Sequence, residues 1–360
     1  MPNAYALIMA GGAGTRLWPL SREKRPKPVL RLVEKDRSMF QIAVERLQPL
    51  FPPERILVVA GADPTPLLKE HAPQLPNENY IIEPVGRDTA PAVGLGAIHI
   101  RHRDPEAVMA VLTADHYIAD VEKFRHVLDV ACRVAAQGMI VTLGIKPAFA
   151  STGFGYIERG PLERVIDGVE VYILQRFREK PDQATADSFV ADGRYSWNSG
   201  MFIWPVKRVL AEFERHVPTL YTELERLASA IGTTGYENLL SEIWPQVKRI
   251  SVDYALMEHI QEGVRVIPVE MGWTDIGNFE TLYDILSLQS GGNVIHGKEP
   301  LVIDTARTLV FSDRLVATLG VEDLVIIDTD DVLLICHRDR SQDVKQLVEH
   351  LKKSQRNEYL

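Results

Sequence analysis

Short apolar runs alternate with helix-like segments from residue 4 to residue 145, and this alternation limits the possible folds most strongly. Strands are predicted at 4–10, 55–61, 79–84, 107–116 and 139–145, with helices predicted at 38–50, 89–103 and 121–136. Such alternation favours an α/β domain with a doubly wound, mostly parallel, Rossmann-like sheet. Ligands of such sheets bind beyond the carboxyl ends of the strands. Gly11, Glu83, Asp115 and His116 fall at such ends.

The pattern loosens after Gly155 and then changes in character. Strands and loops are predicted up to residue 205, followed by a mostly helical stretch at 206–261, a strand and loop at 264–277 and a helix at 278–289. After a predicted hinge at 290–293, short strands are spaced regularly at 300–305, 308–313, 315–320, 324–329 and 332–338, and a helix at 341–353 follows. We therefore expect a large domain at 1–290 and a small β-rich domain at 291–360 that ends in a helix. The regular spacing is typical of a solenoid, with a left-handed β-helix as the candidate.

Composition excludes several classes of function. The net charge of −9 disfavours a general nucleic-acid binder, which is usually basic. The chain has only two cysteines and no Cys-x-x-Cys, so neither a zinc site nor a disulfide framework is indicated. Neither a secretory signal nor an apolar stretch long enough to span a membrane is recognisable. We expect a cytoplasmic protein without membrane or nucleic-acid partners.

The segment "GGAGTRLWPLSREKRPKP" at 11–28 combines glycines with a cluster of cations. Glycines allow backbone N–H groups to approach an anion closely, and Arg16 and Lys27 add full charges. This combination suits a polyphosphate. A P-loop is excluded because Gly-Lys-Ser/Thr is missing, and a dinucleotide fingerprint is excluded because Leu17 stands at the third glycine position. A glycine-rich turn alone is equally consistent with a solvated surface loop.

The full segment resembles the signature of the sugar-1-phosphate nucleotidylyltransferases, and its Trp-Pro-Leu-Ser variant resembles the mannose-1-phosphate guanylyltransferase branch. Further matching motifs occur in the expected order: "EPVGRDTAPA" (83–92), "TADH" (113–116), "TLGIKP" (142–147), "TGFGYIE" (152–158), "FREKPD" (177–182), "WNSGMF" (197–202), "SVDYALME" (251–258) and "GWTDIG" (272–277). The resemblance covers nearly the whole chain.

The resemblance implies transfer of GMP from GTP to mannose 1-phosphate, giving GDP-mannose and pyrophosphate. Because the sugar phosphate and the nucleotide are both anions, the attack of one on the other requires positioning and charge neutralisation. It requires no nucleophile from the enzyme. By resemblance, Mg²⁺ is held by Asp115 and Asp275, and Arg16 and Lys27 act on the phosphates. The remaining implied residues are Ala10, Gly11, Gly12, Gly14, Thr15, Glu83, Gly86, Asp88 and Thr89 for the nucleotide, and Gly155, Glu179, Lys180 and Asn198 for the sugar phosphate.

Each of these assignments has a structural alternative. An aspartate after a strand is often a helix N-cap, and an Asn in a turn often has no ligand. Glu179 and Lys180 could form an exposed ion pair of little consequence. For the base, guanine presents two adjacent donors that a carboxylate can accept. Glu83 is therefore the first candidate for guanine recognition and Asp88 the second.

Two other functions remain open on the sequence alone. One is a different nucleotidylyltransferase that uses dTTP, UTP or ATP with glucose 1-phosphate, and the other is a non-catalytic sensor of a nucleotide sugar. Some family members carry an added isomerase domain with clustered metal ligands, and we expect a single activity here. The β-rich tail is the candidate contact of a homodimer.

Overall fold

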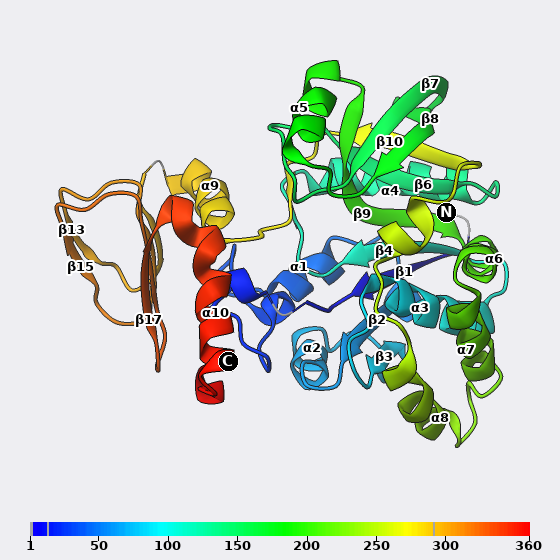
Figure 1. The fold of residues 1–360 in the computed structure, drawn as a ribbon, viewed down its shortest axis with the longest axis horizontal. Helices are drawn as coiled ribbons and strands as arrows, with labels where there is room; N and C mark the ends of the chain where they lie inside the picture. The colour runs from blue at the N-terminus through cyan, green and yellow to red at the C-terminus, as the bar shows by residue number, and fades with distance from the viewer. Residues whose placement is uncertain (1–2, 13, 291) are drawn as a thin grey trace.

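The computed structural model describes residues 3–12, 14–290 and 292–360. Its central feature is a nine-stranded sheet in the order β3-β2-β1-β4-β9-β6-β10-β8-β7 (Figure 1). The strands are β1 (Ala4–Met9), β2 (Ile56–Gly61), β3 (Tyr80–Glu83), β4 (Val108–Thr113), β6 (Ile140–Ile145), β7 (Tyr156–Ile166), β8 (Val169–Arg178), β9 (Tyr195–Pro205) and β10 (Val264–Val269). All but β8 and β9 run in one direction. The prediction of an α/β, mostly parallel sheet is confirmed, with β9 inserted antiparallel between β4 and β6.

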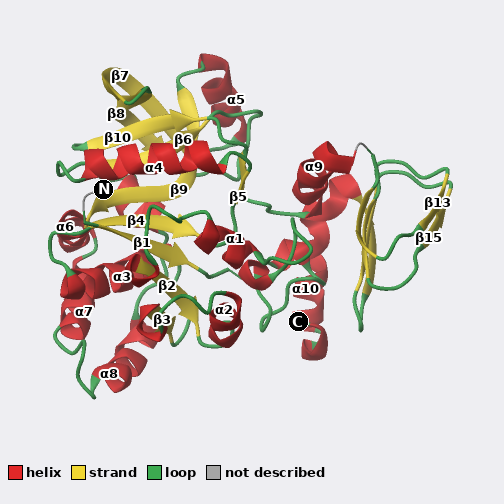
Figure 2. Cartoon of the chain, turned by 180° about the vertical axis from the view of Figure 1, so that it is seen from behind, coloured by secondary structure: helices red, strands yellow, loops and turns green. Residues whose placement is uncertain are grey.

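Helices cover both faces of the sheet (Figure 2). One face packs against α1 (Met39–Glu45), α2 (Thr65–His71), α4 (Val121–Ala135) and α5 (Gln183–Asp192). The other packs against α3 (Thr89–Arg103), α6 (Val206–His216), α7 (Pro218–Ala228) and α8 (Tyr236–Ile243). Side chains alternate along β1, so that Ala6 and Ile8 face the first layer and Leu7 the second. Because helices cover both faces, a ligand of the sheet is expected at the strand ends.

A separate two-stranded ladder lies beyond the end of β4. It pairs β5 (Tyr117–Ile118) antiparallel with β11 (Trp273–Thr274), in the register Trp273↔Ile118 and Thr274↔Tyr117. The strand predicted at 107–116 extends past the end of β4 toward this ladder. The sequence did not predict the ladder, and it did not predict α2 or α5. The ladder brings two motifs that are far apart in the sequence to the same place.

The C-terminal strands form coils of a β-helix. They are β12 (Val294–Gly297), β13 (Leu301–Ile303), β14 (Leu309–Ser312), β15 (Ala317–Leu319), β16 (Leu324–Asp328) and β17 (Leu333–His337). Strands β12, β14 and β16 stack in parallel, and β13 and β15 form a second parallel sheet. The predicted solenoid is confirmed, but β17 pairs antiparallel with β16 and ends the coiling. The left-handed sense stays a prediction.

Two helices connect the β-helix with the main sheet. Helices α9 (Phe279–Ser290) and α10 (Val344–Lys353) lie between the two parts in Figures 1 and 2. Their apolar side chains share one buried core with β14, β16 and residues in or just after the segment 11–28, including Leu17, Trp18 and Leu30. Part of the predicted hinge at 290–293 lies outside the described residues, and the domain boundary after 290 stays a prediction. By its packing, α9 belongs to this shared core.

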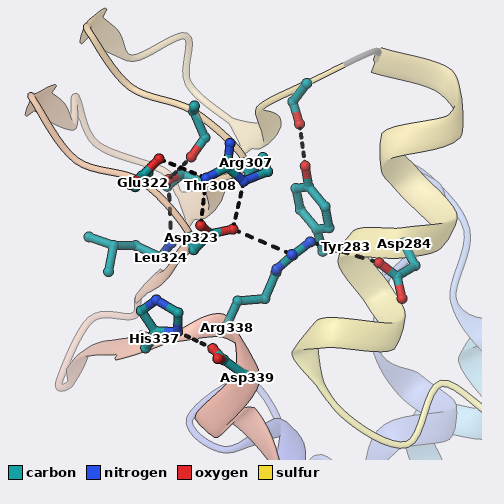
Figure 3. Close-up of polar contacts among 12 residues, drawn as sticks. Tyr283, Asp284, Arg307, Thr308, Glu322, Asp323, Leu324, His337, Arg338 and Asp339 are labelled. Atoms are coloured by element: carbon teal, nitrogen blue, oxygen red, sulfur yellow. Dashed lines mark hydrogen bonds and ion pairs between the residues drawn. The ribbon is translucent and has the colours of Figure 1, made fainter.

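Polar contacts reinforce the same junction (Figure 3). The guanidinium of Arg338 lies 4.5 Å from the ring centroid of Tyr283 on α9 and 3.4 Å from Asp323 Oδ1 of the β-helix. Asp323 also accepts from Arg307. The Tyr283 hydroxyl donates to the carbonyl of Gly292 at 2.9 Å. The β-helix is therefore fixed to α9 by side-chain contacts as well as by the chain.

Among the described residues, no helix combines the length and the apolar character needed to cross a bilayer.

Candidate active site

The glycine-rich turn leaves β1 at the carboxyl edge of the sheet. Ala10 is buried and donates its N–H to the carbonyl of Val59, which continues the strand pairing by one residue. Gly12 and Gly14 then adopt φ values of 101° and 57°, which side-chain-bearing residues rarely adopt. A Cβ placed on Gly11 or Gly12 would contact nothing within 4 Å. Gly11 and Gly12 therefore present bare backbone to open space at the strand end, as an anion-binding turn requires.

Lys27 is the central cation of the site. It lies in a 3₁₀ turn and is only 6% exposed. Its ammonium group donates to Asp115 Oδ2 at 2.9 Å and also to the backbone carbonyl of Asp275. Three segments that are far apart in the sequence therefore meet at one nitrogen atom. A buried lysine with these partners is not the solvated surface charge of the alternative interpretation.

The β5–β11 ladder explains how the two aspartates meet. Asp115 lies two residues before β5 and Asp275 directly follows β11, so antiparallel pairing brings both to the same end of the ladder. The two carboxylates have opposite pKa shifts. Burial would raise the pKa of Asp115, but the charge and the hydrogen bond of Lys27 outweigh it and hold the pKa below its usual value. Burial, with the charge of Asp115, raises the pKa of Asp275.

The donor set fits a divalent cation. The charge of Asp115 raises the pKa of Asp275, so the two carboxylates lie close enough to repel each other. A divalent cation would relieve that repulsion, and carboxylate oxygens are the ligands that Mg²⁺ prefers. No group of three or more His, Cys, Asp or Glu gathers into a metal site within the described parts of the chain. Two protein carboxylates leave room for phosphate oxygens and water in the coordination of the ion.

Arg16 lies beside this pair and is exposed. Its Nη1 donates to Gln342 Oε1 at 3.0 Å, and a Cβ on Gly277 would lie 3.6 Å from the same nitrogen. Its charge lowers the pKa of Asp275, which burial has raised. Arg16 therefore faces the turn that carries Asp275, and Gln342 from the C-terminal part holds it there.

His116 does not act as a base in this arrangement. Its Nδ1 accepts a hydrogen bond from the indole N–H of Trp273 at 3.1 Å, and burial lowers its pKa to about 3. The imidazole is therefore neutral near pH 7. Its hydrogen bond connects the turn of Asp115 to β11, which Asp275 follows.

Glu83 ends β3 and is only 7% exposed. Burial raises its pKa to about 7, although the indole N–H of Trp244 and the backbone N–H of Arg87 donate to it. The Trp244 bond to Oε1 is 3.2 Å long. Trp244 was not among the predicted site residues, because nothing in the sequence relates the end of α8 to the end of β3. A carboxyl group with a pKa near 7 can change protonation when a ligand binds.

The loop after Glu83 forms the start of α3. Asp88 is the N-cap of α3, with Oδ1 accepting from the N–H of Thr89 at 2.8 Å. Thr89 Oγ1 accepts from the N–H of Val252 at 2.8 Å. Gly86 is exposed in the same loop. The loop is thus attached to the segment that contains the "SVDYALME" motif.

A second cluster forms near the carboxyl end of β6. Glu179 is 7% exposed, and its Oε1 lies 2.8 Å from the Lys180 ammonium. A Cβ on Gly155 would lie 2.4 Å from Glu179 Oε2, so only glycine leaves room for this carboxylate. Lys180 has a φ of 41°, which is unusual for a residue with a side chain and marks local strain. The carboxylate of this ion pair is buried, whereas the Lys180 side chain is 54% exposed.

Asn198 and Asp253 complete this cluster. Asn198 lies on β9 opposite Gly144 of β6, and its Nδ2 donates to Asp253 Oδ1 at 2.7 Å. Burial and the neighbouring charge of Glu179 raise the pKa of Asp253 to about 7. Asp253 was not predicted as a site residue, although it lies within a motif that carried the resemblance.

The three clusters follow one another along the carboxyl edge of the sheet. Glu83 ends β3, the glycine turn and Asp115 follow β1 and β4, and Asn198 lies where β9 pairs with the end of β6. The sheet order therefore places one buried carboxylate first, the cationic turn second and the polar cluster third. An elongated ligand with a phosphate-rich middle matches this order.

Comparison with known proteins agrees with this geometry. Residues 5–290 match the family model described as "Nucleotidyl transferase", and residues 298–351 match a "MannoseP isomerase/GMP-like beta-helix domain". A "Mannose-1-phosphate guanylyltransferase" of Escherichia coli (strain K12) is 38% identical, covering 99% of this chain and 75% of that protein. The "Xanthan biosynthesis protein XanB" of Xanthomonas campestris is 36% identical with the same coverage.

A solved structure from Thermus thermophilus has the same fold over nearly its whole length. It is described as a "mannose-1-phosphate geranyltransferase", and it aligns with a TM-score of 0.87 and 37% identity, covering 97% of this chain and 99% of that one. The chain belongs to the nucleotidyl transferase family, and it is an enzyme of that class. Within the family it belongs with the mannose-1-phosphate guanylyltransferases, so the resemblance drawn from the motifs is confirmed.

Proposed function

We propose that this enzyme transfers GMP from GTP to α-D-mannose 1-phosphate, releasing GDP-mannose and pyrophosphate. The observation that carries the proposal is the meeting of Asp115 and Asp275 at the ammonium group of Lys27, directly beside the glycine-rich turn. A phosphate oxygen of the sugar attacks the α-phosphorus in line, and pyrophosphate leaves. Because both reactants are anions, the site must mainly neutralise and orient them.

The phosphates are assigned to the centre of the site. The backbone of Gly11, Gly12 and Gly14, with Ala10 and Thr15 at the two ends of the turn, faces the triphosphate. Lys27 neutralises phosphate near the reacting phosphorus. Arg16 stabilises charge that moves to the leaving pyrophosphate, and its contribution is therefore greatest in the transition state.

The metal of this site is proposed to be Mg²⁺, held by Asp115 and Asp275. Enzymes of this family generally use a divalent metal. When bound, the ion supplies charge neutralisation across the phosphates of the nucleotide. The chain's own part is to keep both carboxylates ionised and oriented, and Lys27 does this by donating to both segments.

The base and the hexose are assigned to the two outer clusters. Glu83 accepts the two adjacent donors of guanine, and Gly86, Asp88 and Thr89 shape the loop around the base. At the other end, Glu179, Lys180 and Asn198 bind the mannose phosphate, with Gly155 providing space. Asp253 is added to this set because it bonds to Asn198.

We further propose that the enzyme works in the cytoplasm, where GTP and sugar phosphates are found, and that it forms a homodimer through the β-helix. The outward face of β13 and β15 carries Leu301, Ile303 and Leu319, all at least 60% exposed. This uncharged face can pack against its own copy about a twofold axis. Light scattering should give twice the monomer mass, and Leu319→Asp should give the monomer. A monomeric parent protein at micromolar concentration would contradict this assembly.

The experiment that tests the function is a matrix of GTP, dTTP, UTP and ATP against mannose 1-phosphate and glucose 1-phosphate. Pyrophosphate release is the signal, with Mg²⁺ present and with chelator as the control. We expect the highest kcat/KM for GTP with mannose 1-phosphate. A higher kcat/KM with another nucleotide and sugar phosphate would assign a different nucleotidylyltransferase activity. The absence of pyrophosphate release with every combination would support a non-catalytic sensor.

A further inference from the structure

Arg46 is a buried arginine without a carboxylate partner among the described residues. It lies just after α1 and is 5% exposed. Its Nη1 donates to the carbonyl of His116 at 2.7 Å and its Nη2 donates to the carbonyl of Thr113 at 3.1 Å. None of the ion pairs in the described parts of the chain includes Arg46. The hydrogen bonds of its guanidinium are directed at backbone oxygens.

The two carbonyls flank Asp115. Thr113 ends β4 and His116 directly precedes β5, so the guanidinium spans the turn that carries the carboxylate. A rigid planar fork can hold two acceptors at a fixed separation, which a point charge cannot do. The turn between the two strands is therefore held through its backbone carbonyls.

Burying an unpaired guanidinium is costly, so its position needs a reason. Burial lowers the pKa of Arg46 to about 10, which still leaves it charged at neutral pH, and the charge of Asp115 opposes the lowering. The cation is itself held in place. Its guanidinium carbon lies 5.7 Å from the ring centroid of Phe124, and Arg125 Nε donates to its backbone carbonyl at 2.8 Å. A chain of contacts therefore runs from α4 through Arg46 to the turn of Asp115.

We propose that Arg46 is a positioning residue which holds the turn from Thr113 to His116 so that Asp115 is oriented to bind the divalent cation of the nucleotide complex. The hydrogen bonds of its guanidinium reach the backbone of that turn, and through that backbone Arg46 acts on Asp115. The inference rests on the proposed function, because it takes Asp115 as a metal ligand.

The test uses Arg46→Met and Arg46→Lys, with Arg103→Lys as the matched control. Arg103 also donates to backbone carbonyls, those of Glu54 and Glu78, but at the end of α3 away from the site. Binding of Mn²⁺ to the full chain with GTP and without sugar phosphate is measured by electron paramagnetic resonance, so no turnover is needed. Steady-state kinetics then give the Mg²⁺ concentration for half-maximal rate and the KM for mannose 1-phosphate.

Arg46→Met should weaken Mn²⁺ binding about 10- to 100-fold, which is the usual effect of removing a residue that orients a metal ligand. The Mg²⁺ requirement should rise in parallel, while the KM for mannose 1-phosphate stays within about twofold of that of the parent protein. Arg46→Lys keeps the charge and loses the fork, so it should recover only part of the loss. Arg103→Lys should bind Mn²⁺ normally.

Normal Mn²⁺ binding in folded Arg46→Met would overturn the proposal. If circular dichroism shows that Arg46→Met does not fold, Arg46→Lys decides, and a Mn²⁺ affinity equal to that of the parent protein overturns it. A general defect, in which the KM for mannose 1-phosphate rises as much as the Mg²⁺ requirement, also overturns it. If the parent protein itself binds no Mn²⁺ with GTP, the proposed function has failed. This outcome is distinguishable because it concerns the parent protein and not the variants.

Discussion

Gly155→Ala offers a sharp test of the sugar cluster, because the added methyl group meets one carboxylate oxygen. The new Cβ would lie 2.4 Å from Glu179 Oε2, whereas ordinary contact begins at 3.4 Å, so the carboxylate must move by about 1 Å. Gly155 is buried and its φ is not in the left-handed region, so alanine adds no backbone strain. The clash is with a side chain, and we expect the fold to survive.

The expected loss follows from hydrogen bonds to a displaced charge. A hydrogen bond to a charged group contributes about 1.5–3 kcal/mol, and its loss lowers kcat/KM for mannose 1-phosphate roughly 10- to 150-fold. The KM for GTP should change less than about twofold, since the base cluster lies at the other end of the site. Pyrophosphate release at varied mannose 1-phosphate, with saturating GTP and Mg²⁺, measures the first quantity, and varied GTP measures the second.

Gly153→Ala is the matched control. Its Cβ would contact only Ser151 Oγ, at 3.5 Å, so it changes the same loop without a clash. We expect near-normal kinetics for this variant. If Gly155→Ala also keeps the normal kcat/KM for mannose 1-phosphate, or if only its KM for GTP rises, Glu179 does not bind the sugar and the reasoning from the clash is refuted.

Three further predictions address the rest of the molecule. Asp115→Asn and Asp275→Asn should each lower turnover by about two orders of magnitude or more at limiting Mg²⁺, and near-normal turnover in either variant would remove that residue from the ligand set. In the enzyme without GTP the pKa of Glu83 is about 7, and the two donors of guanine need its ionised carboxylate. Below pH 7 the carboxylate is increasingly protonated, so the KM for GTP should rise about tenfold per pH unit. Glu83→Gln should lose this pH dependence and its preference for GTP over dTTP. If that preference is lost only in Asp88→Asn, Asp88 and not Glu83 recognises the base. A chain that ends after residue 290 should unfold at lower temperature or aggregate, since the shared core would be opened; unchanged thermal unfolding would argue against that core's contribution.

The sheet and the positions of its ligand-binding ends could be predicted from the sequence because local patterns carry that information. The helix predicted at 89–103 is α3 to the residue, and the glycines and acids at strand ends lie on one edge, as parallel pairing requires. The placement of β9 between β4 and β6 could not be predicted. Its second half, residues 201–205, is apolar at every position, and such a pattern does not specify a neighbour or a direction.

The partners of the site residues were harder to predict than the residues themselves. Asp253 and Trp244 reach the site by tertiary packing, from helical segments whose periodicity gives no sign of a ligand. Arg46 resembles an ordinary charged residue at the end of a helix, and only the structure shows that it is buried. The β5–β11 ladder has two residues on each strand, which is too short for any pattern to show.

The contact of Trp18 with the C-terminal segment has a consequence for synthesis on the ribosome. Its indole N–H donates to the carbonyl of Tyr359, and the two residues are separated by 341 positions in the chain. At about 5–20 residues per second, the signature segment waits roughly 20–70 s after it is translated before this partner exists. The nascent chain can form much of its sheet during that time, but the loop with Arg16 lacks its support. Catalytic competence should therefore appear only after Tyr359 has been translated.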